Sequence, residues 1–344
     1  MNKLSKIGVS ALCGSLAAVS SANAGEMSVS GSASMTWVSL DEVTTGNPLG
    51  IATGMTFSGS GELDNGTTFT VSIAHTHKNV YSVSAISLTT PTLGTFVYDE
   101  GGGTGLDRLD DKMPTAWEES DGTGLGAGLQ TVGGAGNSTD IEWTVGSDFM
   151  PDGLTLRVAY APHPDGTKNS KKGTGGESGG AEVMNGSGWD VVVEYTGVEG
   201  FNLFGGYSEV DQVSNLGDRE AMALGFTYAL GGVTFGYQIS HDNTPGVDAA
   251  TTDAYDNNAW GVSFAVNDDL SISYGTHEST KENSNGTATG NGIDITTESK
   301  SFQVSYTMGG ASLVFAQSEV DNSKYATAAA NQTEGRTVAL TLAF

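Results

Sequence analysis

The chain has 344 residues, a formal net charge of −26 at neutral pH, and 50 glycines but only 7 prolines. Such a charge repels nucleic acid and other polyanions and attracts cations, so nucleic-acid binding is excluded as a function. The low proline count excludes a collagen-like or proline-rich chain. Beyond the first two dozen residues, no stretch approaches the ~18 consecutive apolar residues of a transmembrane helix.

Residues 1–24 have the pattern of a secretory signal peptide. Lys3 and Lys6 form a positive start, an apolar stretch follows over residues 7–19, and the segment ends in Ala-Asn-Ala. A small residue, any residue and another small residue at this place form a cleavage signal. We therefore expect export and cleavage after Ala24.

The remaining residues, 25–344, contain no cysteine, because the single one is Cys13. They carry no disulfide framework. Apolar side chains alternate along them with small or polar ones, the period of two that indicates a β-strand. About sixteen such segments occur, at residues 27–37, 51–59, 69–73, 81–88, 93–98, 141–145, 154–160, 189–195, 203–207, 222–228, 233–239, 260–266, 270–274, 302–308, 311–315 and 337–344. The even number and the spacing suit tilted membrane strands of ~9–11 residues.

The connections between these segments alternate between short and long. Short turns rich in glycine, proline, asparagine and aspartate lie at residues 64–66, 91–92, 151–153, 197–200, 230–232, 267–269 and 309–310. Longer polar segments lie mostly between them, at residues 95–140, 161–188, 241–256 and 276–299. Outer-membrane barrels have short turns on the periplasmic side and long loops outside. The pattern therefore predicts an all-β fold, a transmembrane antiparallel β-barrel, rather than a soluble sandwich.

Aromatic residues gather at the ends of the predicted strands. Four of the five tryptophans are expected at the long-loop ends, namely Trp37, Trp143, Trp189 and Trp260. The last segment alternates up to a terminal aromatic, Phe344. Two aromatic belts at the membrane interfaces are typical of a lipid-facing barrel, and the polar second face of each strand indicates a watery lumen.

In its signal peptide, strand count, terminal phenylalanine and third long loop, the chain resembles the Gram-negative general porins, specifically the alphaproteobacterial type. The resemblance implies a loop after the fifth strand that folds into the barrel and forms the narrowest point. Residues 99–139 occupy that place, with eight acids between Asp99 and Asp121 against two bases. By the resemblance, one side of the constriction is lined by Asp107, Asp110, Asp111, Glu118 and Glu119.

The opposite side of such a constriction is expected to be basic, which sets an electric field across the pore. Alternation along the strands gives three cations that point into the lumen, Arg157, Arg219 and Lys78. Arg157 is the strongest candidate, because a lone arginine in mid-strand among apolar neighbours needs water or a carboxylate partner. A structural salt bridge without effect on selectivity is the alternative for this residue.

Clustered carboxylates also suggest a metal site. Calcium binds several oxygen ligands, so Asp107, Asp110 and Asp111 are candidate ligands, although no EF-hand spacing is present. His75 and His77 share a strand face but have no further ligands nearby in sequence. No motif of a hydrolase, metalloprotease, phosphate-binding loop or dinucleotide site occurs in a suitable context, so we expect no enzymatic activity.

These features predict a water-filled channel in the outer membrane of a Gram-negative bacterium, for passive diffusion of small hydrophilic solutes and ions, without a required cofactor. The acidic loop predicts a bias towards cations. The expected partners are outer-membrane lipids, the permeating solutes and, by the resemblance, further copies of the chain in a homotrimer. Two alternatives stay open: a substrate-specific channel whose loop holds one ligand, and a plugged structural or adhesive barrel whose surface loops bind partners.

Overall fold

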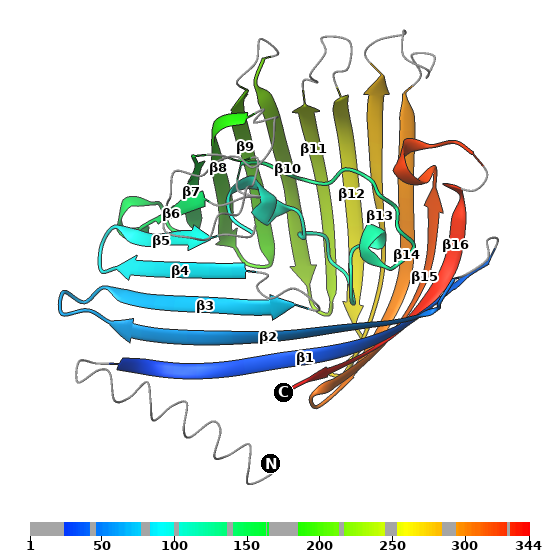
Figure 1. Cartoon of the computed structure of the whole chain (residues 1–344), viewed down its shortest axis with the longest axis horizontal. Helices are drawn as coiled ribbons and strands as arrows, with labels where there is room; N and C mark the ends of the chain where they lie inside the picture. The colour runs from blue at the N-terminus through cyan, green and yellow to red at the C-terminus, as the bar shows by residue number, and fades with distance from the viewer. Residues whose placement is uncertain are drawn as a thin grey trace.

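Figure 1 shows the chain in a computed structural model. The structure describes residues 24–41, 46–76, 83–99, 103–135, 140–162, 164, 185–212, 217–244, 253–283, 294–328 and 331–344. The predicted signal peptide, apart from its last residue, lies outside the described residues.

The strands of the described residues form one closed barrel, in which each strand pairs with its neighbours in sequence and β1 pairs antiparallel with β16 (Figure 1). Their bounds are β1 (Ala24–Leu40), β2 (Leu49–Glu62), β3 (Thr68–Thr76), β4 (Val83–Thr90), β5 (Gly94–Asp99), β6 (Asp140–Val145), β7 (Leu154–Ala161), β8 (Asn185–Val198), β9 (Phe201–Gln212), β10 (Arg219–Leu230), β11 (Val233–Thr244), β12 (Asp253–Ala265), β13 (Leu270–Asn283), β14 (Ile295–Met308), β15 (Ala311–Asp321) and β16 (Thr333–Ala343). The predicted sixteen-stranded antiparallel barrel is confirmed.

Short 3-10 helices accompany the strands in the described chain. They are η1 (Gly105–Leu109), η2 (Ser120–Gly122), η3 (Ser147–Phe149) and η4 (Ser323–Tyr325). No helix among the described residues has the length and apolar character needed to span a membrane. The seven predicted short turns all lie between strand pairs of the barrel, from β2–β3 to β14–β15.

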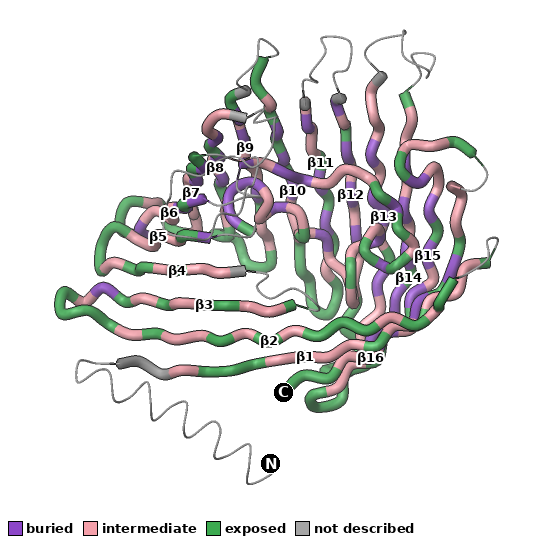
Figure 2. Tube along the Cα trace, viewed as in Figure 1, coloured by how far each residue is buried: buried purple, intermediate pink, exposed green. Residues whose placement is uncertain are grey.

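The two faces of each strand differ in exposure. On β10, Met222 and Leu224 are 50% and 54% exposed, whereas Ala221 and Ala223 are 4% exposed. The large apolar side chains therefore point outwards, as the wall of a membrane barrel requires. Figure 2 shows buried residues gathered along β8 to β15, on the side of the barrel where a segment fills part of the interior.

The barrel closes through its last residue. The backbone N–H of Gly31 donates to the Phe344 oxygen, and the N–H of Phe344 donates to the Gly31 carbonyl, both at 2.9 Å. A Cβ at position 31 would lie 2.6 Å from the Phe344 ring. Glycine on β1 therefore leaves room for the terminal aromatic ring to lie over this position.

Two long loops are shorter than predicted. β11 continues to Thr244 and β12 begins at Asp253, so strand pairing takes up much of residues 241–256. β13 likewise continues to Asn283, inside the predicted loop 276–299. Beyond the apolar belt both faces of a strand contact water. The alternation of apolar and polar residues that indicates a strand in the sequence is therefore lost there.

Trp143 lies at the opposite strand end from the one expected. Its indole Nε1 donates to the Leu93 carbonyl, in the turn between β4 and β5, at 2.8 Å. Its ring stacks on Phe96 with centroids 5.9 Å apart. β6 has only six residues, so an outward position near its end already belongs to the turn side of the barrel.

Candidate functional site

The segment between β5 and β6 enters the barrel and crosses its interior (Figure 1). We define its described part, residues 103–135, as the lumen loop. Its first helix, η1, contacts β7 to β10, and its second, η2, contacts β13 and β14. This is the place that the sequence predicts for the third loop.

An apolar cluster holds the first half of the lumen loop against the wall. Leu106 and Leu109 of η1 are fully buried. The other members of the cluster are Met113, Val132, Val192, Phe204, Ala221, Ala223 and Ala259. Because burying one leucine side chain contributes about 1.5–3 kcal/mol, the two leucines stabilise the contact of η1 with β8, β9 and β10.

Wall carboxylates bind the backbone at the start of η1. Asp190 of β8 accepts hydrogen bonds from the N–H of Leu106 at 2.8 Å and of Ala135 at 3.0 Å. Glu142 of β6 accepts one from the N–H of Gly105 at 2.8 Å. Gly105 has φ +55°, and a Cβ there would lie 2.1 Å from the Asp190 carboxylate. The close approach of loop and wall therefore requires glycine at this position.

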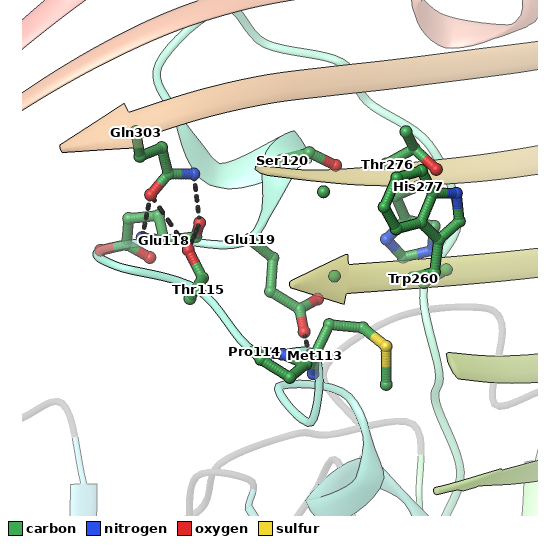
Figure 3. A pocket seen from close by; sticks show the side chains of 13 residues that line it. Met113, Pro114, Thr115, Glu118, Glu119, Ser120, Trp260, Thr276, His277 and Gln303 are labelled. Carbon is green, nitrogen blue, oxygen red and sulfur yellow. Dashed lines mark hydrogen bonds between the residues drawn. The ribbon is translucent and has the colours of Figure 1, made fainter. Parts of the chain in front are cut away.

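A pair of wall glycines receives the segment of the lumen loop between η1 and η2. A Cβ at Gly236 of β11 would lie 2.5 Å from Pro114, and a Cβ at Gly261 of β12 would lie 2.6 Å from it. We define these two residues as the glycine notch. Next to it, Gln303 of β14 donates from Nε2 to the Glu118 carbonyl at 2.6 Å (Figure 3). The loop is thus bound to the wall at both ends of its path.

The five predicted loop acids fall into two groups. Asp111 and Glu118 are exposed. The other three are partly buried and accept backbone N–H groups, Asp107 from Gly103, Asp110 from Val132 and Glu119 from Met113. Only part of the acidic run is therefore free to face a permeating ion.

Burial raises the pKa of these loop carboxyls. It raises the pKa of Asp110 to about 6 and that of Glu119 to about 8, with neighbouring acids adding to both shifts. Burial also raises the pKa of Asp107 and of Glu118. At neutral pH, Asp110 is largely ionised, whereas Glu119 is more often protonated.

Two of the predicted lumen cations lie on the wall, and each contacts a carboxylate. Arg157 Nη1 lies 3.0 Å from Glu194 Oε2. Arg219 Nη2 lies 2.7 Å from Asp242 Oδ2. Lys78 lies outside the described residues.

Potential metal ligands gather at two places among the described residues. In each, one ligand atom per residue lies within 4.8 Å of the others: Glu119, Asp121 and His277 in the first, and Glu209, Asp211 and Asp218 in the second. The candidate calcium ligands Asp107, Asp110 and Asp111 do not form such a group in the described chain.

Comparison with known proteins decides the family. The model of a family described as Gram-negative porin matches residues 8–324, nearly the whole chain. The chain belongs to the Gram-negative porin family. It is therefore an outer-membrane diffusion channel, and the lumen loop crosses the interior of its barrel.

Solved porins share this fold at low sequence identity. OmpF of Salmonella typhi, solved with daunomycin, is 14% identical with a TM-score of 0.70, over 93% of this chain and 98% of that one. A porin refined at 1.8 Å is 15% identical with a TM-score of 0.64, over 93% and 100%. The anion-selective porin from Comamonas acidovorans is 13% identical with a TM-score of 0.64, over 93% and 100%. No curated protein matches.

Both cations of the lumen loop form ion pairs with carboxylates on the barrel wall. The sequence prediction for this porin does not include these wall carboxylates. Lys112 Nζ lies 2.7 Å from Glu194 Oε1, and Arg108 forms an ion pair with Glu142. The ammonium of Lys112 also lies 5.7 Å from the ring centre of Phe204. Both acids alternate with outward apolar residues along their strands, so their inward direction could be read from the sequence in the same way as for the wall arginines.

Proposed function

We propose that this porin conducts cations in preference to anions. The observation that supports the proposal is a difference in pairing inside the barrel. Asp111 and Glu118 are exposed loop acids. Arg157 and Arg219 are held by Glu194 and Asp242, whose side chains are only 13% and 3% exposed. Among the described residues, Asp111 and Glu118 form no ion pair with a cation, so a permeating ion is expected to meet their negative charge.

The expected size of the effect follows from Coulomb's law. An exposed carboxylate attracts a cation at 4 Å by about 1 kcal/mol in water, roughly a fivefold local enrichment. Two such acids give a clear preference at low salt, and screening reduces it once the Debye length falls to ~3 Å at 1 M salt. The proposed preference is therefore moderate and depends on salt.

Local charges, rather than the fold, carry this proposal. The Comamonas acidovorans porin shares the fold and is described as anion-selective. The fold therefore does not by itself imply a preference for cations, and the proposal depends on the pairing of individual side chains in this chain.

The test is the reversal potential of the purified protein in a planar bilayer with a potassium chloride gradient. We expect a cation-favouring potential in the wild type, which moves towards zero in the double variant Asp111→Asn, Glu118→Gln. The matched control removes two exposed turn acids, Asp64→Asn and Asp268→Asn, and should leave the potential unchanged. A chloride-favouring wild type, or equal shifts in both double variants, would refute the proposal.

The same bilayer experiment separates general diffusion from the alternatives. We propose passive diffusion of small hydrophilic solutes without a catalytic step. Conductance that a sugar, amino acid or phosphate blocks in a saturable way would instead establish a substrate-specific channel. Insertion without conductance would establish a plugged barrel.

Assembly as a homotrimer is also part of the proposal. It is supported by family membership and by the likeness to OmpT of Vibrio cholerae, which is described in a trimer form. Light scattering in detergent should give three times the mass of one chain, and a monomeric mass would exclude the trimer under those conditions.

Two further expectations stay predictions. The N-terminus of the exported protein should be Gly25, which intact-mass analysis can check. Calcium binding by Asp107, Asp110 and Asp111 should give heat in calorimetry with millimolar calcium. If no heat is measured, the prediction of calcium binding is wrong.

A further inference from the structure

The far end of the lumen loop meets the wall at three residues that can bind a metal ion. Glu119 and Asp121 lie at η2, and His277 is an inward residue of β13 that is only 4% exposed. The segment is held in place, because the Ser299 hydroxyl donates to the Ser120 carbonyl at 2.7 Å. Figure 3 shows Glu119, Ser120 and His277 among the residues that line the neighbouring cavity.

His277 has a buried nitrogen without a hydrogen-bond partner. Its Nδ1 makes no hydrogen bond, and Oδ1 of Asp121 lies 3.7 Å away, beyond the usual hydrogen-bond range of about 2.7–3.2 Å. A buried polar atom without a hydrogen bond destabilises the fold unless a ligand satisfies it. Two ligand atoms, each ~2.1 Å from one tetrahedral ion, lie about 3.4 Å apart. The separation of Nδ1 and Oδ1 therefore suits a shared ion better than a direct hydrogen bond.

Glu119 is oriented towards the same place. Its Oε1 accepts the Met113 N–H at 2.8 Å, which fixes the carboxylate group and leaves a second oxygen to offer. Such an outer contact is typical of residues that ligate metals. Glu119 and His277 also line a cavity of about 10 Å³, which is close to the room that a single water-sized species needs.

The ligand types indicate the class of ion. Calcium and magnesium prefer oxygen ligands throughout, so a buried imidazole argues against them. Zn²⁺ binds histidine nitrogen and carboxylate oxygen, with water as a common fourth ligand. Ligand atoms of Glu119, Asp121 and His277 lie within 4.8 Å of one another, which is close enough to surround one ion.

We propose that Glu119, Asp121 and His277 bind a divalent transition-metal ion, best matched by Zn²⁺, that joins the lumen loop to β13. The proposal goes beyond the channel's cation preference and does not depend on it, because metal binding is measured without current. Loss of cation preference with zinc uptake intact would refute only the selectivity proposal.

Calorimetric titration of the untagged protein in detergent, stripped of metal with EDTA and then given ZnCl₂, tests the site. We expect a binding event that saturates at one ion per chain. Loss of a ligand in His277→Gln or Asp121→Asn should weaken it by more than the roughly 10–100-fold that the loss of an outer partner costs. The matched control is His241→Gln, because His241 pairs with Asp256 at 2.7 Å on the outward face of the barrel and should not affect binding.

A second readout follows the ion itself. Co²⁺ in place of Zn²⁺ should give visible absorption bands that disappear in His277→Gln but not in His241→Gln. Zinc should also slow hydrogen exchange in residues 113–123 of the wild type. If the wild type takes up no zinc, the proposal is wrong, whatever the variants do, and His277 and Asp121 form an ion pair only. Uptake that survives His277→Gln, or equal competition by Ca²⁺, overturns it as well.

Discussion

The glycine notch gives a sharp test of how the lumen loop is held. In Gly261→Ala, the new methyl group would lie 2.6 Å from the Pro114 carbonyl oxygen, whereas ordinary contacts begin at 3.4 Å. The carbonyl oxygen belongs to the backbone, so it cannot rotate out of the way as a side chain could. Pro114 must therefore move by roughly 0.8 Å away from β12 to restore van der Waals distance. Overpacking of this kind costs about 1–3 kcal/mol.

The shift also strains the hydrogen bonds beyond Pro114. The Ala116 N–H donates to the Ser273 hydroxyl at 2.9 Å, and a displacement of ~0.8 Å along this direction takes it out of hydrogen-bond range. The loss of one hydrogen bond adds about 0.5–1.5 kcal/mol. We therefore expect the segment between η1 and η2 to be destabilised by about 2–4 kcal/mol, which corresponds to local opening roughly 30 to 1,000 times more frequent.

Hydrogen exchange measured by mass spectrometry over residues 113–119 reports this opening directly, and single-channel conductance reports its effect on the pore. The matched control is Gly59→Ala in β2, where a Cβ meets no atom within 4 Å. It makes the same chemical change in a strand without the contact. If the loop exchanges at the same rate in Gly261→Ala and Gly59→Ala, the notch does not hold the loop and the argument is wrong.

Three further predictions concern the charges and the apolar anchor. Glu194→Gln removes the carboxylate shared by Arg157 and Lys112, so the reversal potential should shift towards chloride. Burial raises the pKa of Asp110 to about 6, so this residue gains a proton as the pH falls from 7 to 5. Losing this charge relieves its burial and its repulsion with Asp111, so the docked loop should become more stable in that window. Hydrogen exchange of residues 107–113 should be faster in the wild type than in Asp110→Asn at pH 7, and equal in the two at pH 5. Leu106→Ala should weaken loop docking by about 2–5 kcal/mol, seen as faster proteolysis of the lumen loop.

Alternation along the chain predicts the barrel well because lipid and water impose opposite demands on the two faces of every strand. The same reason explains where the prediction fails. At Thr244 and Asn283 the strands have left the apolar belt, so both faces are polar and the sequence there cannot be told from a loop. The prediction for Trp143 is wrong for a different reason. An outward aromatic residue in the middle of a segment does not show which end of a short strand is nearer.

The contacts of the lumen loop could be predicted less well than the direction of the side chains that make them. Strand parity places Asp190 inward as surely as it places Arg157. Its partner, Leu106, is 84 positions away in sequence, and only the path of the loop through the barrel brings the two together. Parity is a local property, whereas the pairing of an inward acid with loop backbone or with a loop cation is a tertiary one.

Some acids bind other parts of the protein and others are exposed to the pore. The net charge of −26 therefore does not by itself determine the ion selectivity of the pore. Asp190 and Glu142 accept hydrogen bonds from the loop backbone, and Glu142 also pairs with Arg108. Glu194 forms ion pairs with Arg157 and Lys112. Such acids are structural, because removing one leaves buried donors or cations without a partner. The field that a solute meets comes instead from the few acids left exposed. It follows that neutralising a wall acid should disturb both the loop and the selectivity, whereas neutralising an exposed loop acid should change the selectivity alone.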